Sequence, residues 1–142
     1  LELLRSLYGV VLVPRAVLDE LSAGLAHGDD TPDLAILDWV CVREVVVPAD
    51  IGSIVDFGKG EAGVIAIGLG LQESALLILD DRLGLRVAVE HGLKVTGTAG
   101  VLLKAKRLGI ISSVVQCLNE MLRAGFYLRK RVFDDIKELA GE

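Results

Sequence analysis

Short apolar runs alternate along the chain with longer segments of helical spacing. Runs rich in Val, Ile and Leu predict strands at residues 10–13, 40–47, 75–81 and 93–98. The spacing of apolar positions favours helices at residues 1–7, 14–24, 33–40, 60–72, 82–92, 99–109, 114–125 and 128–142. Strands separated by helical crossovers predict an α/β fold: a three-layer α/β/α arrangement with a central parallel sheet.

Helix boundaries have their own signals. Pro14 suits a first helical turn, and Gly24 is expected to end that helix. The Thr-Pro pair at 31–32 predicts an N-cap and first turn for the next helix. Ser113 followed by Gln116 matches a capping box.

The composition is strongly apolar. Of 142 residues, 52% are hydrophobic and the mean hydropathy is +0.55. No stretch free of Asp, Glu, Lys and Arg approaches the roughly 18 apolar residues that a membrane span needs. A parallel sheet buried on both faces explains the composition instead, and we expect one domain with no membrane segment.

The two cysteines, Cys41 and Cys117, lie far apart and near neither His27 nor His91. There is no C-x-x-C motif, so neither a zinc site nor a disulfide framework is indicated. Buried free thiols are typical of a reducing compartment, and we expect a cytoplasmic protein.

The net charge of −5 conceals an asymmetry. Residues 1–79 carry 12 acidic and 4 basic side chains, whereas residues 80–142 carry 8 acidic and 11 basic ones. The basic side chains of the second half either contact nucleic acid or lie on solvated helix faces. They include Lys104, Lys106 and the run 129–131.

A glycine motif lies at residues 58–63, where Gly58, Gly60 and Gly63 match the dinucleotide-binding pattern G-x-G-x-x-G. Asp80 and Asp81 follow at about the distance of a ribose-binding carboxylate. Electrostatics and the preceding segment both argue against a nucleotide bound at this motif.

A pyrophosphate binds to the free N–H groups at a helix start, but Glu61 occupies this first turn and would repel it. The preceding segment holds Gly52, Ser53 and Asp56, which makes it a poor buried strand.

Four acidic residues lie at or near predicted strand–helix junctions: Glu20, Glu61, Asp80 and Asp81. Carboxylates from separate elements that share one cleft suit Mg²⁺ or Mn²⁺, which support phosphodiester hydrolysis. Each also has a plainer interpretation. Glu20 suits a solvated helix position, Glu61 a dipole-stabilising first turn, and Asp81 the N-cap of the next helix.

Residues 58–111 closely resemble the PIN-domain nucleases. The resemblance rests on a helix starting Gly-Glu-Ala at 60–62, the strand end LLILDDR at 76–82, and VTGTAGVLLKAK at 95–106. Residues 7–21 and 118–128 are also similar to that family.

The resemblance implies a Mg²⁺- or Mn²⁺-dependent ribonuclease related to the VapC-type toxins. It makes Glu20, Glu61 and Asp80 the second, third and fourth acids of a catalytic metal site, with Asp81 as the alternative fourth. Thr96 and Thr98 either flank that site or are turn residues. The resemblance also implies an RNA substrate, an antitoxin-like regulatory protein as partner, and a homodimer.

One part of the family pattern is missing. Its first acid is an Asp at the end of an N-terminal central strand, and no segment of residues 1–142 matches it. We therefore expect a single PIN-like domain over residues 1–142 that lacks this strand, through loss of the N-terminus or because another chain supplies it. The alternative function is a catalytically incomplete module that binds nucleic acid or protein.

Overall fold

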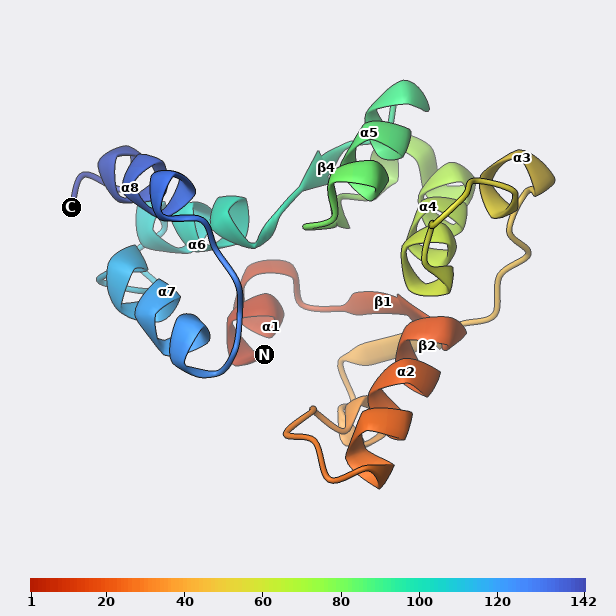
Figure 1. Ribbon diagram of the computed structural model, residues 1–142, viewed down its shortest axis with the longest axis horizontal. Helices are drawn as coiled ribbons and strands as arrows, with labels where there is room; N and C mark the ends of the chain where they lie inside the picture. The colour runs from red at the N-terminus through yellow and green to blue at the C-terminus, as the bar shows by residue number, and fades with distance from the viewer. The chain divides into compact units, whose positions relative to one another are not determined.

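The computed structural model describes all residues from 1 to 142. The chain forms two compact units, Leu1–Thr96 and Gly97–Glu142 (Figure 1), and each is considered by itself. None of the helices is both long and apolar enough to cross a bilayer.

The first unit contains the strands and most of the helices. Its elements in chain order are α1 (Glu2–Tyr8), β1 (Val11–Pro14), α2 (Arg15–Ala26), η1 (Leu34–Ile36), β2 (Val40–Arg43), α3 (Ala49–Gly52), α4 (Lys59–Leu71), η2 (Gln72–Ser74), β3 (Leu77–Ile78), α5 (Arg82–Glu90) and β4 (Val95–Thr96).

The strands form two parallel pairs. β1 pairs with β2, with Val11 opposite Val40, and β3 pairs with β4, with Leu77 opposite Val95. Both pairs join consecutive strands through helical crossovers, as parallel pairing requires. This confirms the predicted α/β class with parallel strands. The pairing takes the form of two two-stranded sheets, β1–β2 and β3–β4.

A contact of Thr31 explains two wrong boundary predictions. Its hydroxyl donates to the carbonyl oxygen of Leu21 at 3.0 Å, so it braces α2 rather than capping the next helix. Its methyl group would lie 3.0 Å from a Cβ at Gly24. Gly24 therefore makes room for Thr31, and α2 continues past it to Ala26.

The region after Thr31 also differs from the expectation. Instead of a helix over residues 33–40, only the single turn η1 forms, with the Asp33 carboxylate accepting from the Ala35 N–H at 3.0 Å. The strand predicted to reach residue 47 ends at Arg43, opposite Pro14. At that point β1 turns into α2, so no strand remains to pair with Val46, which is 92% exposed.

Helix α4 is rich in glycine because it packs closely against two strands. A Cβ at Gly63 would lie 2.6 Å from the Pro14 Cβ, and one at Gly68 would lie 2.8 Å from Leu77 Cδ1. Both distances are shorter than real Cβ contacts, so a side chain at either position would force a neighbouring group to shift. Ile65 of the same helix is fully buried in the main core of this unit.

The second unit consists of three helices, α6 (Thr98–Arg107), α7 (Val114–Arg123) and α8 (Lys130–Leu139). Each buries an apolar stripe; the buried residues are Val101, Leu102, Ala105, Val114, Leu118 and Ile136. Ser113 begins α7 as predicted, because its hydroxyl accepts from the Gln116 N–H at 3.0 Å.

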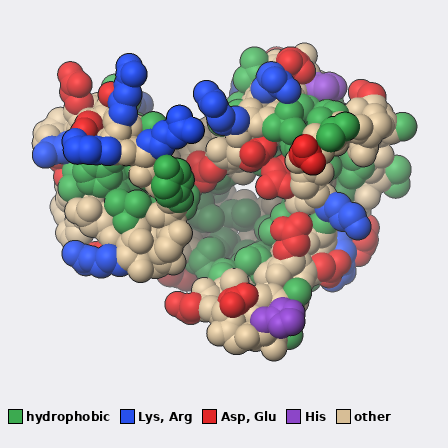
Figure 2. Space-filling model, in the orientation of Figure 1, with side chains coloured by type: hydrophobic (Ala, Val, Ile, Leu, Met, Phe, Trp, Pro, Cys, Tyr) green, Lys and Arg blue, Asp and Glu red, His purple; other side chains and the backbone are tan.

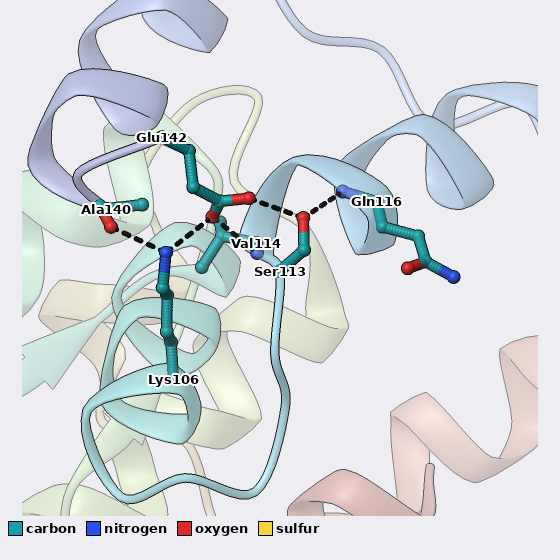
Figure 3. Close-up of polar contacts among 6 residues, drawn as sticks. All are labelled: Lys106, Ser113, Val114, Gln116, Ala140 and Glu142. Atoms are coloured by element: carbon teal, nitrogen blue, oxygen red, sulfur yellow. Dashed lines mark hydrogen bonds and ion pairs between the residues drawn. The ribbon is translucent and has the colours of Figure 1, made fainter.

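The last residue closes this unit (Figure 3). The Glu142 carboxylate accepts hydrogen bonds from the Ser113 hydroxyl and, at 2.7 Å, from the Val114 N–H. Lys106 Nζ lies 3.1 Å from Glu142 Oε2 and donates to the Ala140 carbonyl at 2.7 Å. The Ser113 hydrogen bond is the main cause that lowers the pKa of Glu142 to about 2. Lys106, one of the candidate RNA contacts, is therefore engaged in holding the second unit together.

Candidate metal and nucleic-acid site

A large cavity of about 720 Å³ opens within the first unit. Its walls are the whole of β1 and β3, its floor is one face of α4, and α1 and the first turns of α2 contribute at its ends. Most of this lining is apolar. Figure 2 shows hydrophobic side chains recessed in this hollow and carboxylates along its margin.

All four acidic residues singled out in the sequence line this cavity: Glu20, Glu61, Asp80 and Asp81. They come from three segments that are well separated in the chain. Glu20 lies in α2, Glu61 in the first turn of α4, and the two aspartates between β3 and α5. The cavity is thus acidic where these segments meet and apolar elsewhere.

Glu20 and Glu61 approach each other through the start of α4. A Cβ at Gly60 would lie 3.4 Å from both carboxylate oxygens of Glu20, so this side chain packs against the backbone next to Glu61. The Glu61 carboxylate folds back over Gly58 and occupies the space that a Cβ there would take. Glycine at both positions allows two carboxylates to lie at one helix N-terminus, whose dipole favours negative charge.

The two aspartates have different surroundings. Asp81 Oδ2 accepts from the Gly84 N–H at 2.8 Å, so Asp81 is the N-cap of α5, as its plainer interpretation predicted. Asp80 directly follows Leu79, whose N–H donates to the Thr96 carbonyl at 2.9 Å. It therefore stands just beyond the last paired residue of this sheet, at the carboxyl end where α/β proteins place their ligands.

The donor chemistry fits a hard divalent cation, because carboxylate oxygens are the ligands that Mg²⁺ and Mn²⁺ prefer. The side chains do not form a converged ligand shell. Nowhere in residues 1–142 do three His, Cys, Asp or Glu side chains stand close enough together to hold a metal ion. The four carboxylates share a cavity, and an ion would require their rotamers to turn toward it.

Comparison with protein-family models shows which family the chain belongs to. A family model described as a PIN domain matches residues 1–142. The chain belongs to the PIN-domain family. No curated protein and no solved structure matches it. Membership implies nuclease-type activity, binding of nucleic acid and, in general, use of divalent metal ions.

The packing of α4 also explains the glycine motif at residues 58–63. Gly63 is needed for the close contact of α4 with Pro14, and Gly60 gives α4 room to pack on Val17 beside Glu20. The pattern G-x-G-x-x-G thus has a packing explanation in this PIN domain. The role of Gly60 beside Glu20 was missed in the sequence, although a glycine inside a helical pattern signals close approach of another group.

Proposed function

We propose that this PIN domain is a divalent-metal-dependent ribonuclease of the toxin type. The observation that carries the proposal is that Glu20, Glu61 and Asp80, from three separate elements, line one cavity. Like charges are costly to gather, and they persist together mainly where a cation compensates them. The motifs shared with PIN-domain nucleases support the same assignment.

In this proposal Glu20, Glu61 and Asp80 hold one or two Mg²⁺ or Mn²⁺ ions. When bound, such ions supply a more acidic attacking water and neutralise charge on the phosphodiester. The Asp81 carboxylate accepts from the Gly84 N–H and so holds the first turn of α5, which keeps Asp80 in position. Arg82 begins α5 beside these acids and is a candidate contact for the RNA backbone.

A toxin-type nuclease has further expected properties. We propose that the chain acts in the cytoplasm, assembles as a homodimer and is held in check by an antitoxin-like regulatory protein. The surface carries large exposed apolar side chains suited to such contacts, among them Ile36, Val46 and Tyr127.

The test is Mn²⁺-dependent cleavage of a fluorescent RNA by the wild type and by three variants, one of a proposed ligand and two controls. Asp80→Asn removes a proposed ligand and is expected to lower the rate at least 10²-fold, with unchanged circular dichroism. Asp81→Asn is the matched variant, because Asn is an equally good N-cap and keeps α5 in place. It should retain most of the activity.

Asp19→Asn serves as a second control, since Asp19 is exposed beside Glu20 but does not line the cavity. Equal rates for the wild type and Asp80→Asn would remove Asp80 from the site. Equal losses in Asp80→Asn and Asp19→Asn would show that overall charge, rather than a metal site, is being measured.

One observation favours the second candidate function, a catalytically incomplete module that binds nucleic acid or protein. Among residues 1–142, no three metal-ligating side chains converge. Calorimetric titration with Mn²⁺ separates the two functions. Heat that disappears in Asp80→Asn supports the nuclease, whereas RNA binding without Mn²⁺ heat supports the binding module.

A further inference from the structure

A second cavity, of about 290 Å³, adjoins the acidic cavity within the first unit. Pro14 lines both. Gly60 and Glu61 line the acidic cavity, whereas Lys59 and Ala62 from the same helical turn line the second one. The first turn of α4 therefore separates the two cavities. A group bound in the second cavity would lie next to the proposed metal ligands.

An ion pair stands in the wall of the second cavity. Arg15 Nε lies 2.7 Å from Glu44 Oε1, and both residues line the cavity. The pair joins the first residue of α2 to the segment just after β2. The two side chains are 49% and 76% exposed, so a ligand can reach them. Their contact uses one of the five guanidinium N–H donors and one of about four acceptor positions on the carboxylate.

Much of the remaining wall is apolar. Val45, Val47 and Phe57 line it, and Phe57 is half-buried. Pockets for small molecules begin at about 300 Å³, so this cavity suits one flat heterocycle rather than a whole nucleotide. Single-stranded RNA is commonly held by bases that stack on aromatic side chains and form hydrogen bonds along their edges. A base in this cavity would meet apolar groups on its faces and the ion pair at its edge.

Guanine complements this ion pair better than the other bases do. Its Watson–Crick edge presents the O6 acceptor next to two donors, N1–H and N2–H. The guanidinium of Arg15 can donate to O6, and the Glu44 carboxylate can accept from both N–H groups. Adenine and cytosine have an amino group but no adjacent ring N–H, and uracil has one ring N–H and no amino group. Two adjacent donors for one carboxylate are found in guanine alone.

We propose that this second cavity binds a guanine base of single-stranded RNA and so sets the base preference of the domain. Glu44 and Arg15 are its specificity-determining residues. The proposal rests on the proposed ribonuclease function for its substrate class. Lys59 is exposed at the first position of α4 and lines the cavity, which suits a contact with the phosphate that links this guanine to the acidic cavity.

The experiment measures the binding of fluorescein-labelled heptanucleotides by fluorescence anisotropy, in EDTA so that no metal-dependent cleavage occurs. UUUGUUU should bind at least tenfold more tightly than the same RNA with A, C or U at its centre, as expected for a bidentate base contact. Equal affinities for the four RNAs would overturn the proposal. GMP is titrated as a competitor, and GMP that binds as tightly as UUUGUUU would overturn the assignment to RNA in favour of a free nucleotide.

Glu44→Gln tests the carboxylate, because it keeps the size of the side chain but replaces one acceptor oxygen with a donor. The preference for guanine should fall below about threefold, with unchanged circular dichroism. Glu2→Gln is the matched control, since Glu2 is also exposed and paired with an arginine, Arg5, but lines neither cavity. It should keep the full preference. A preference that persists in Glu44→Gln, or that is lost equally in both variants, would overturn the proposal.

A pair of neighbouring substitutions tests the location. Val45→Trp places a large side chain in the second cavity and should lower the affinity for UUUGUUU to that for UUUAUUU. Val46→Trp adds the same side chain at a 92% exposed position that does not line the cavity, and should preserve the preference for guanine. An unchanged preference in Val45→Trp would show that guanine binds elsewhere.

Cleavage in Mn²⁺ distinguishes this proposal from the proposed function. Guanine-selective binding without cleavage would remove the ribonuclease function and leave the base site in place. Cleavage at all four bases without guanine-selective binding would overturn the base site alone. Cleavage next to guanine by the wild type, lost in Glu44→Gln and kept in Glu2→Gln, would support both.

Discussion

The carboxylate of Glu20 packs against the bare backbone of Gly60, with both oxygens 3.4 Å from where a Cβ would stand. Gly60 is buried and immediately precedes Glu61. This contact brings the Glu20 carboxylate to the backbone next to Glu61, a second proposed metal ligand.

Gly60→Ala should therefore impair the proposed activity more than the stability. The new methyl group would meet Val17 Cγ2 at 3.1 Å, tighter than most Cβ contacts, and would stand 3.4 Å from the Glu20 carboxylate oxygens. We expect a loss of about 1 kcal/mol in the free energy of unfolding, the low end for overpacking. RNA cleavage should fall at least tenfold in a Mn²⁺ assay. An unaltered cleavage rate would show that RNA cleavage does not depend on the position of the Glu20 carboxylate.

Gly63→Ala should act on stability, since its Cβ would lie 2.6 Å from the Cβ of Pro14. The proline ring is rigid and α4 must shift, so we expect a loss of about 1–3 kcal/mol in urea denaturation. Gly70→Ala is the matched control in the same helix, because a Cβ there meets nothing within 4 Å. It should instead gain about 0.5–1 kcal/mol from helix propensity.

Glu142 should make the stability of the second unit depend on pH. The pKa of its carboxyl is lowered from 4.5 to about 2, chiefly by the Ser113 hydrogen bond. A lowered pKa in the folded state means that the ionised form stabilises the protein above pH 4.5, and this contribution is lost as the pH falls toward 2. Glu142→Gln should lower the Tm at pH 7 but not near pH 2.

Thermal unfolding followed by circular dichroism measures this difference at both pH values. Glu138→Gln removes an exposed carboxylate from α8 and should leave the Tm near that of the wild type throughout. A Tm difference between Glu142→Gln and the wild type that persists undiminished at pH 2 would contradict the assignment.

The two thiols should differ in reactivity. Burial raises the pKa of the Cys117 thiol, with smaller contributions from the nearby carboxylates of Glu120 and Glu142. Cys41 is exposed on β2. Because the thiolate is the reactive species, iodoacetamide at pH 8 should alkylate Cys41 several-fold faster than Cys117. Mass spectrometry of single-cysteine variants checks this, and equal rates would contradict it.

The sequence predicted that Glu20, Glu61, Asp80 and Asp81 could face one cleft, and all four line one cavity. Glu20 lies in the helix after β1, and Asp80 and Asp81 lie between β3 and α5, so the carboxyl ends of two strands bring these residues together. Glu61 joins them from the first turn of α4. The capping roles of Asp81 and Ser113 were also predictable, because each carboxylate or hydroxyl bonds an N–H only three residues away. Interactions of this kind depend on local backbone geometry alone.

The boundaries that failed depend on distant partners. Gly24 did not end α2 because Thr31 packs on it, and the strand after Val40 stopped where β1 ended opposite it. No local pattern reports such contacts. By itself, the sequence determined the α/β class, the crossover helices and the acidic residues, since periodicity, caps and charge are properties of short segments. The tertiary structure decided that β1 pairs with β2 and β3 with β4 as two separate sheets, because pairing joins segments that lie apart along the chain.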